Sequence, residues 1–386
     1  MALGTALETD TAWNEARTLY QAALHTDPQN SELIARLGNC CLELGQPAAA
    51  IAVLAPAAEN NLDDAALQSA IGAAYAATGL WEEALLSFEQ ALRSAPQDAC
   101  LLSRAATAAA TVQHFPQAIE LLKKALQAEP DNAELQALLA RCLEATGEKA
   151  AAHTAYLRAA DIEPHDAKHL VELGNSWLGT GSQTLALAAY ERAAIAAPQD
   201  PAVLLTLAEA QLNAGNTQTA IESFTKAAAA CTNDEDAPLH AQCLRRIAES
   251  WAAIGNTDRT LDAWKAAAET FPMDAAIHSA LGRSLMAVGR AADSQAAHAT
   301  AARLERTQPS HLLAAAKAAI AAGDSAASNT FAQQAASLPL EQPEELGTLG
   351  HLHHQLGDVQ KALEPDSART AVSDRPKTSI QKWRST

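Results

Sequence analysis

The fold of this chain is decided by residues 64–98, which read DAALQSAIGAAYAATGLWEEALLSFEQALRSAPQD. Apolar residues recur at three- and four-residue steps on both sides of Gly79, and Pro96 stands near the end. This pattern predicts two amphipathic helices joined by a short turn at the glycine. Proline lacks a backbone N–H, so we expect the second helix to stop there and a new unit to begin.

The same pattern returns along the chain with a period of 34 residues. One column is alanine, at positions 23, 57, 91, 125, 159, 193 and 227, and again at 267 and 301. A second column, three residues earlier, holds large apolar residues, namely Tyr20, Leu54, Phe88, Leu122, Tyr156, Tyr190, Phe224 and Trp264. A small residue in phase with a large one at this period predicts one helical unit copied along the chain.

The columns also indicate which repeat this is. Within residues 64–98 the key positions are Ile71-Gly72, Tyr75, Gly79, Trp81, Ala84, Phe88, Ala91 and Pro96. This set resembles the tetratricopeptide repeat, and the match recurs from about Leu3 to Ala362. The resemblance implies an all-α fold, a right-handed superhelical solenoid of helix-turn-helix repeats.

The repeat phase divides residues 1–364 into one elongated array of about ten units. The expected boundaries are 1–30, 31–64, 65–98, 99–132, 133–166, 167–200, 201–240, 241–274, 275–308, 309–341 and a partial unit at 342–364. Six extra residues between Ala227 and Ala267 predict a longer loop with an acidic tip at residues 233–236. We expect the polar, basic tail at residues 365–386 to be disordered.

The last repeat lacks the polar capping helix with which such arrays normally close. This predicts that the array is truncated, or that its exposed end docks on a second copy of the chain or on a partner. Self-association through uncapped terminal repeats is therefore an expectation.

Composition excludes several classes of partner. The net charge of −18 disfavours nucleic acids and anionic membranes, since both would repel the body of the chain. No apolar run approaches the roughly 20 residues that a bilayer span needs. Residues 1–15 do not have the pattern of a signal peptide, so we expect a cytoplasmic protein.

Motifs for chemistry are absent from the sequence. There is no phosphate-binding glycine loop, nucleophile elbow or His-Glu-x-x-His helix, so we expect neither an enzyme nor a cofactor. The six cysteines include no Cys-x-x-Cys pair, and His351 and His354, three residues apart, supply only two ligands. The sequence pattern therefore predicts no metal site.

The resemblance implies that the first helix of each repeat lines a concave groove. Its groove-facing positions supply the candidate partner-binding residues, namely Asn39, Arg141, Lys168, Asn175, Arg245, Arg283 and Lys317. Arginine and lysine capture carboxylates by charge-assisted hydrogen bonds, and an asparagine amide can clamp a peptide backbone. The open alternative is a solvated surface on which these residues pair with Glu134, Glu144, Glu209 and Glu249.

Together these patterns predict a non-enzymatic scaffold that binds a peptide or a partner segment in the groove. One alternative is an accessory arm of a multi-component enzyme, for example a glycosyltransferase, or of a secretion machine. Another is chaperone-like holding of apolar segments, because small uncharged residues line the early groove. The carboxylate clamp of this family is disfavoured, since Ala35 and Ala73 stand where that clamp needs polar residues.

Overall fold

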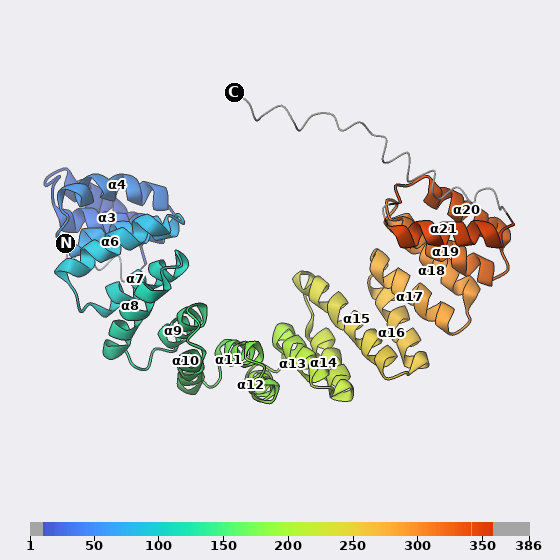
Figure 1. Cartoon of the computed structure of the whole chain (residues 1–386). Coiled ribbons are helices and arrows are strands. Elements are labelled where there is room, and N and C mark those ends of the chain that lie inside the picture. Colours follow the sequence, from blue (N-terminus) through green and yellow to red (C-terminus); the bar gives the residue numbers. More distant parts are fainter. Residues whose placement is uncertain (1–10, 341, 358–386) are drawn as a thin grey trace, which may run out of the picture. The chain divides into compact units, whose positions relative to one another are not determined.

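The computed structural model describes residues 11–340 and 342–357. It divides into two compact units, Met1–Pro198 and Gln199–Thr386, called unit 1 and unit 2 (Figure 1). Within the described residues every regular element is a helix. The expectation of an all-α fold built from helical repeats is confirmed.

Among its described residues, unit 1 contains the second helix of one repeat, followed by five complete helix pairs. Its helices are α2 (Trp13–Leu24), α3 (Ser31–Glu43), α4 (Pro47–Asn60), α5 (Ala65–Ala77), α6 (Trp81–Ser94), α7 (Ala99–Thr111), α8 (Phe115–Ala128), α9 (Ala133–Ala145), α10 (Lys149–Ile162), α11 (Ala167–Gly179) and α12 (Gln183–Ala196). From α3 onward, first helices of 13 residues alternate with second helices of 14 residues. This alternation gives the 34-residue period its structural form.

Unit 2 continues the alternation and departs from it twice. Its helices are α13 (Pro201–Asn213), α14 (Thr217–Ala230), the 3-10 helix η1 (Asp234–Asp236), α15 (Ala237–Ala253), α16 (Thr257–Thr270), α17 (Ala275–Ala287), α18 (Ala291–Leu304), α19 (Pro309–Ala321), α20 (Ser325–Ala336) and α21 (Pro343–Gln355). The departures are a longer α15, of 17 residues, and a shorter α20, of 12 residues.

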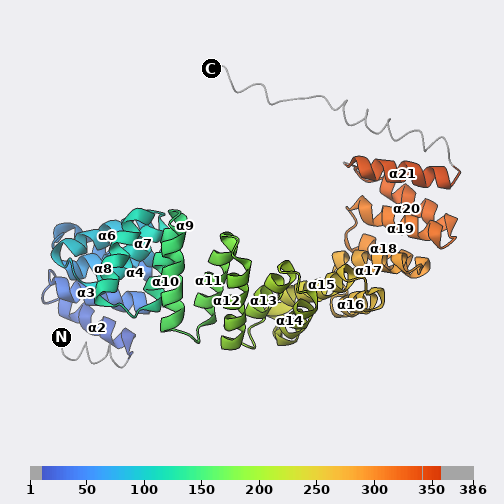
Figure 2. The ribbon, with the colours of Figure 1, turned by 60° about the horizontal axis from the view of Figure 1, so that its bottom comes forward.

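Each helix packs against the helices before and after it in its unit. Figure 2 shows this stacking for α7 to α10 in unit 1 and for α19 to α21 in unit 2. First helices of successive repeats also contact one another, as α3 with α5 and α13 with α15. The core is therefore a series of contacts between neighbours, which is the architecture of a solenoid.

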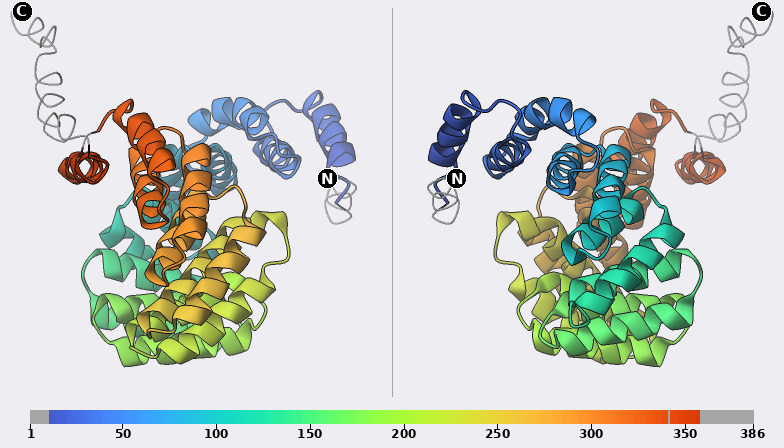
Figure 3. Two further views of the ribbon diagram at one scale, coloured as in Figure 1. Left: turned by 90° about the vertical axis from the view of Figure 1, so that its right-hand side faces the viewer. Right: turned by 90° about the vertical axis from the view of Figure 1, so that its left-hand side faces the viewer.

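The two sequence columns form the centre of each repeat. All eight large residues of the column from Tyr20 to Trp264 are buried, with exposed fractions between 0% and 6%. The alanines from Ala91 to Ala301 are 0% exposed, whereas Ala23 and Ala57 are partly exposed. Figure 3 shows the stacked helix pairs from two opposite sides. The repeating core is thus made from small and large side chains in alternation.

The turns inside the repeats have left-handed backbone, mostly at glycines that recur at the position of Gly79, as the sequence predicts for that turn. Gly79, for example, has a φ of 81°. At the corresponding position of the next repeat stands Gln113, which adopts a φ of 64°. Its backbone makes the same turn bonds, because the His114 amide donates to the Ala109 carbonyl at 2.8 Å. Gln113 therefore holds a conformation that its side chain disfavours.

The first helices begin at polar caps that the glycine and alanine columns do not reveal. In seven repeats an Asp or Asn side chain accepts a backbone N–H of the first turn, from Asn30, Asp64, Asp98, Asn132, Asp166, Asp200 and Asp274. Six of these residues follow a proline by two positions, and that proline ends the chain's previous unit. In these six repeats the proline and the cap together fix where the repeat starts.

The insertion after Ala227 has a different structure from the predicted long loop. Residues 234–236 form η1, and α15 begins directly afterwards at Ala237. The extra residues therefore form one 3-10 turn and a longer helix, and the expected boundary between residues 240 and 241 falls inside α15. The opening of the first repeat at residues 1–10 and the tail at residues 365–386 lie outside the described residues.

We predict that Gln113→Gly stabilises the protein, because glycine adopts the left-handed turn without a steric penalty. The expected gain is about 1 kcal/mol in the free energy of unfolding. Gly147→Gln is the matched reverse change, at a φ of 85° in the following repeat, and should cost a similar amount. Urea unfolding followed by circular dichroism measures both. Equal stability of Gln113→Gly and wild type would contradict the strain.

A second prediction concerns two glycines of α11. A Cβ atom at Gly174 would lie 2.8 Å from the Cδ1 atom of Tyr190, whereas a Cβ atom at Gly179 would meet nothing within 4 Å. We expect Gly174→Ala to destabilise the protein by roughly 1–3 kcal/mol. Gly179→Ala should be neutral or stabilising by up to about 1 kcal/mol. Thermal melts of the two variants test this, and indistinguishable melts would show that the close approach is unimportant.

Candidate functional site

The seven candidate binding residues all lie on first helices. They belong to α3 (Asn39), α9 (Arg141), α11 (Lys168 and Asn175), α15 (Arg245), α17 (Arg283) and α19 (Lys317). Arg245 is half-buried and the other six are exposed. The structure places them in different surroundings, and these surroundings separate the candidates of unit 1 from those of unit 2.

In unit 1 the candidate cations are paired with carboxylates of neighbouring first helices. Lys168 Nζ donates to Glu134 Oε1 at 2.9 Å, and Arg141 lies 3.8 Å from Glu172. The hydrogen bond raises the pKa of Lys168 and lowers that of Glu134. Exposed ion pairs of this kind contribute little to stability, but they reduce the charge that a ligand would meet.

The two asparagines of unit 1 differ from each other. The Tyr190 hydroxyl donates to Asn175 Oδ1 at 2.7 Å, so part of this amide is already used inside the repeat. Burial raises the pKa of Tyr190 to about 12, and the phenol therefore keeps its proton at neutral pH. Asn39 is exposed on α3, three repeats before the nearest candidate cation, Arg141 on α9. The unit 1 candidates do not form one site.

In unit 2, Glu209 and Glu249 pair with Arg246, which is not among the candidates predicted from the sequence. Arg246 donates from Nε to Glu209 at 2.6 Å, makes a second contact with the same carboxylate, and also reaches Glu249 at 3.2 Å. Its guanidinium lies 5.9 Å from the ring centre of Phe224. The neighbouring Arg245 makes no ion pair with any described residue. The alternative that the candidate cations pair with Glu209 and Glu249 is therefore wrong in unit 2, because both carboxylates pair with Arg246.

Arg283 and Lys317 line one pocket of about 640 Å³ in unit 2. Arg283 donates to the Ser279 hydroxyl at 3.3 Å, and Lys317 donates to the Thr348 hydroxyl at 3.3 Å. Neither cation forms an ion pair within residues 11–340 and 342–357. Among the seven candidates, Arg283 and Lys317 thus lie in one pocket, and no described carboxylate forms an ion pair with either of them.

The remaining lining of this pocket is mixed in character. Apolar side chains come from α17 and α19, chiefly Met286 and Leu313. Glu344 and Glu345, in the first turn of α21, add negative charge on another side. The pocket therefore offers cations, anions and an apolar surface to one ligand, as binding sites for peptide segments do.

His298 also lines the pocket and stands in the large apolar column, 34 residues after Trp264. It is 3% exposed, and its Nδ1 atom has no hydrogen-bond partner among the described residues. Burial, together with the charges of Arg283 and His311, lowers the pKa of His298 to about 4. The imidazole is therefore neutral at physiological pH. Extending the 34-residue column by one step would have found this residue.

The fold defines a helical-repeat protein whose first helices carry the candidate binding side chains. Models of the family described as tetratricopeptide repeat match residues 10–74 and 111–171, residues 147–201 and 171–238, and residues 66–102. Together these matches cover residues 10–102 and 111–238, more than half of the chain. The chain belongs to the tetratricopeptide repeat family, which confirms the resemblance found in the sequence.

Several solved structures are similar to this chain. MamA from Desulfovibrio magneticus RS-1 is 20% identical over 42% of this chain and 92% of its own, with a TM-score of 0.40. YrrB, described as a TPR protein with an unusual peptide-binding site, is 18% identical over 46% and 92%, with a TM-score of 0.43. A tetratricopeptide repeat protein from Parabacteroides merdae is 16% identical over 64% and 96%, with a TM-score of 0.45.

Comparison with curated protein sequences gives no match. In the part of the chain that the structure describes, none of the helices is both long and apolar enough to cross a bilayer.

We predict that His298 makes unit 2 sensitive to acid. The folded pKa of about 4 lies below the ordinary 6.5, so its stabilising contribution is complete above pH 6.5 and is lost as the pH falls towards 4. The expected loss is up to about 3 kcal/mol. His298→Phe should remove this part of the pH dependence, since Phe88 already packs against a glycine in the same way.

The measurement is urea unfolding of the full-length protein, wild type and His298→Phe, at about pH 7 and about pH 4.5. The difference between the two free energies of unfolding should shift in favour of the variant at the lower pH. If the difference between the two free energies of unfolding stays constant with pH, His298 binds a proton in the folded state as readily as in the unfolded state.

Proposed function

We propose that this chain is a protein-interaction scaffold whose unit 2 binds a peptide segment with acidic and apolar side chains. Tetratricopeptide repeats act in general as scaffolds for other proteins, and the family match extends this role to the chain. The observation that carries the finer proposal is the pocket holding Arg283 and Lys317, two cations without an ion-pair partner among the described residues.

The chemistry of the pocket selects the ligand. A carboxylate of the peptide would lie between the guanidinium of Arg283 and the ammonium of Lys317, where charge-assisted hydrogen bonds are strong. An apolar side chain beside it would cover Met286, which is 37% exposed, and remove that surface from water. Neutral His298 adds no charge of its own, because burial keeps it deprotonated.

Glu344 and Glu345 restrict the choice further. A segment that is acidic along its whole length would be repelled where it passes these two carboxylates. The pocket therefore favours a peptide with one acidic group, followed by apolar or basic residues. In unit 1 the corresponding cations are occupied by Glu134 and Glu172, so we expect them to make no measurable contribution to binding.

The proposal is tested by panning a random peptide display library against the full-length protein and measuring the affinity of the enriched peptides. Arg283→Ala/Lys317→Ala should lower the affinity for these peptides at least about tenfold. This factor corresponds to the loss of one hydrogen bond to a charged group. Binding to wild type should also weaken as salt rises, because the pocket is open to solvent.

Two control double variants remove the same number of positive charges as Arg283→Ala/Lys317→Ala. Lys226→Ala/Lys265→Ala removes two cations from the second helices of unit 2, where Lys226 is exposed and Lys265 lies 3.8 Å from Asp262. Arg141→Ala/Lys168→Ala removes the paired cations of unit 1. Both should bind like wild type. Enriched peptides without carboxylates, or equal weakening in all three double variants, would contradict the proposed pocket.

A further inference from the structure

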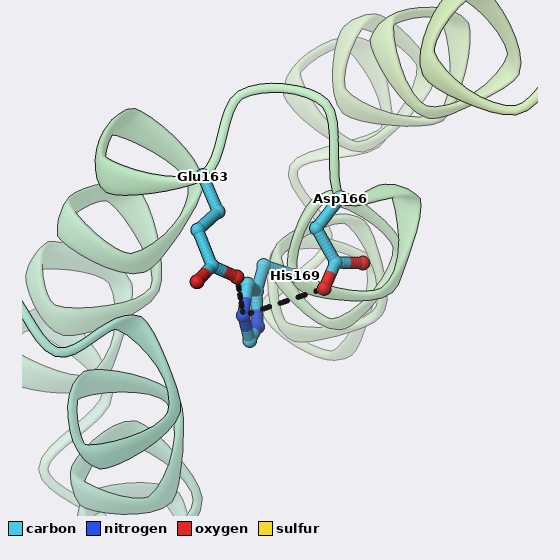
Figure 4. Close-up of side chains that lie close together, drawn as sticks. All are labelled: Glu163, Asp166 and His169. Carbon is cyan, nitrogen blue, oxygen red and sulfur yellow. Dashed lines mark ion pairs between the residues drawn. The ribbon is translucent and has the colours of Figure 1, made fainter.

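Three side chains converge at the turn between α10 and α11 in unit 1 (Figure 4). Glu163 directly follows α10, Asp166 precedes α11, and His169 lies in the first turn of α11. One carboxylate oxygen or ring nitrogen from each lies within 4.8 Å of the other two. His169 Nε2 is 3.4 Å from Glu163 Oε2 and 3.8 Å from Asp166 Oδ2. The three groups point into one small volume.

The imidazole of His169 is buried without a hydrogen bond. Its side chain is 0% exposed, and neither ring nitrogen has a hydrogen-bond partner among the described residues. Separations of 3.4 and 3.8 Å are longer than an N–H to oxygen hydrogen bond. Buried polar atoms nearly always have a hydrogen-bond or ligand partner. Because Nε2 of His169 faces two carboxylates and has no such partner, we expect another group to lie between them.

Neighbouring contacts fix the direction of each atom. Asp166 caps α11, and its Oδ1 accepts the backbone N–H of Lys168 at 2.7 Å, so that Oδ2 faces His169. On the other side of the ring, Glu172 Oε2 lies 4.0 Å from Nδ1 and is itself buried without a hydrogen-bond partner. A carboxylate behind the second ring nitrogen is the usual arrangement that orients a metal-ligating histidine.

Charge at this turn is uncompensated by lysine or arginine. Lys168 Nζ binds Glu134 at 2.9 Å, and Arg141 lies 3.8 Å from Glu172. Within the described residues neither Glu163 nor Asp166 forms an ion pair with a lysine or an arginine. Two carboxylates therefore face the histidine, and a cation is the group that would balance them.

Packing of the repeat does not explain a histidine at this position. The equivalent residues of the other repeats in unit 1 are Leu33, Leu67, Leu101 and Leu135. One equivalent in unit 2 is also a histidine, His311, whose Nε2 lies 3.0 Å from Glu305 in an ordinary hydrogen bond. There Gln308 stands where unit 1 has Asp166, so the second carboxylate is missing. The chain thus contains a matched pair of turns, with and without the third group.

The separations suit a small divalent transition metal ion. Zinc binds histidine nitrogen and carboxylate oxygen at about 2.0–2.2 Å, so two ligands of a tetrahedral shell lie roughly 3.4 Å apart. Calcium and magnesium prefer shells made of oxygen alone, which the imidazole disfavours. The side chains of Glu163 and Asp166 are 49% and 37% exposed, which leaves a path for the ion from solvent.

We propose that Glu163, Asp166 and His169 form a zinc site that joins the end of α10 to the start of α11. The three side chains supply three ligands, and water completes the shell. The site ties two successive repeats of unit 1 together at their connecting turn. Sequence reasoning missed it because its ligands stand around a proline turn, in columns that otherwise hold cap and core residues.

The test is calorimetric titration of the metal-free, full-length protein with zinc chloride, together with thermal melts. Wild type should bind one zinc ion at this site and unfold at a higher temperature with zinc. Glu163→Gln should weaken binding on the order of 100-fold, and His169→Leu should abolish it. His169→Leu introduces the leucine found in the other repeats, so its melt without zinc should equal or exceed that of wild type.

Two variants are expected to keep the site. His311→Leu changes the matched turn that lacks the third group, and His351→Gln/His354→Gln removes the other closely spaced histidines. Retained binding in both, with loss in His169→Leu, supports the proposal. Wild type without saturable zinc binding, wild-type binding in His169→Leu, or loss only in His351→Gln/His354→Gln would overturn it.

Discussion

The contact on which the rest of the structure depends is the close approach of the two helices within each repeat. At this crossing the first helix presents glycine or alanine to a large side chain of the second helix. An added Cβ atom at Gly72 would lie 2.7 Å from a ring carbon of Phe88, and Gly38, Gly174 and Gly282 are equally close to Leu54, Tyr190 and His298. The backbone itself is the packing surface, so the helices cannot separate or slide without opening a cavity.

This constraint fixes the direction of the exposed faces and leaves their chemistry free to vary. Similar first-helix positions carry cations in both units, yet Lys168 is paired with Glu134, whereas Arg283 and Lys317 share a pocket and form no ion pair with any described residue. The difference comes from which residues the neighbouring helices supply. Binding specificity in such an array therefore depends on pairs of adjacent repeats and not on single columns.

Departures from the columns mark the positions with unusual chemistry. His298 replaces a large apolar residue and brings a buried, neutral imidazole to the pocket of unit 2. His169 replaces a leucine and brings a buried imidazole to two carboxylates in unit 1. Gln113 replaces a glycine and holds a left-handed turn. In each case the repeat fixes the backbone conformation, and the atypical side chain occupies a position that the repeat normally fills with another residue type.

The sequence by itself determined the helical repeat, its period, its buried columns and its family, because packing between neighbouring helices imposes the same small and large residues on every unit. It also named the cations that line the pocket, Arg283 and Lys317, among seven candidates. Only the tertiary structure decided which candidates are paired, that Arg246 and not Arg245 holds Glu209, and that Glu163, Asp166 and His169 meet. These outcomes depend on side-chain directions across adjacent helices, and a spacing along the chain does not specify those directions.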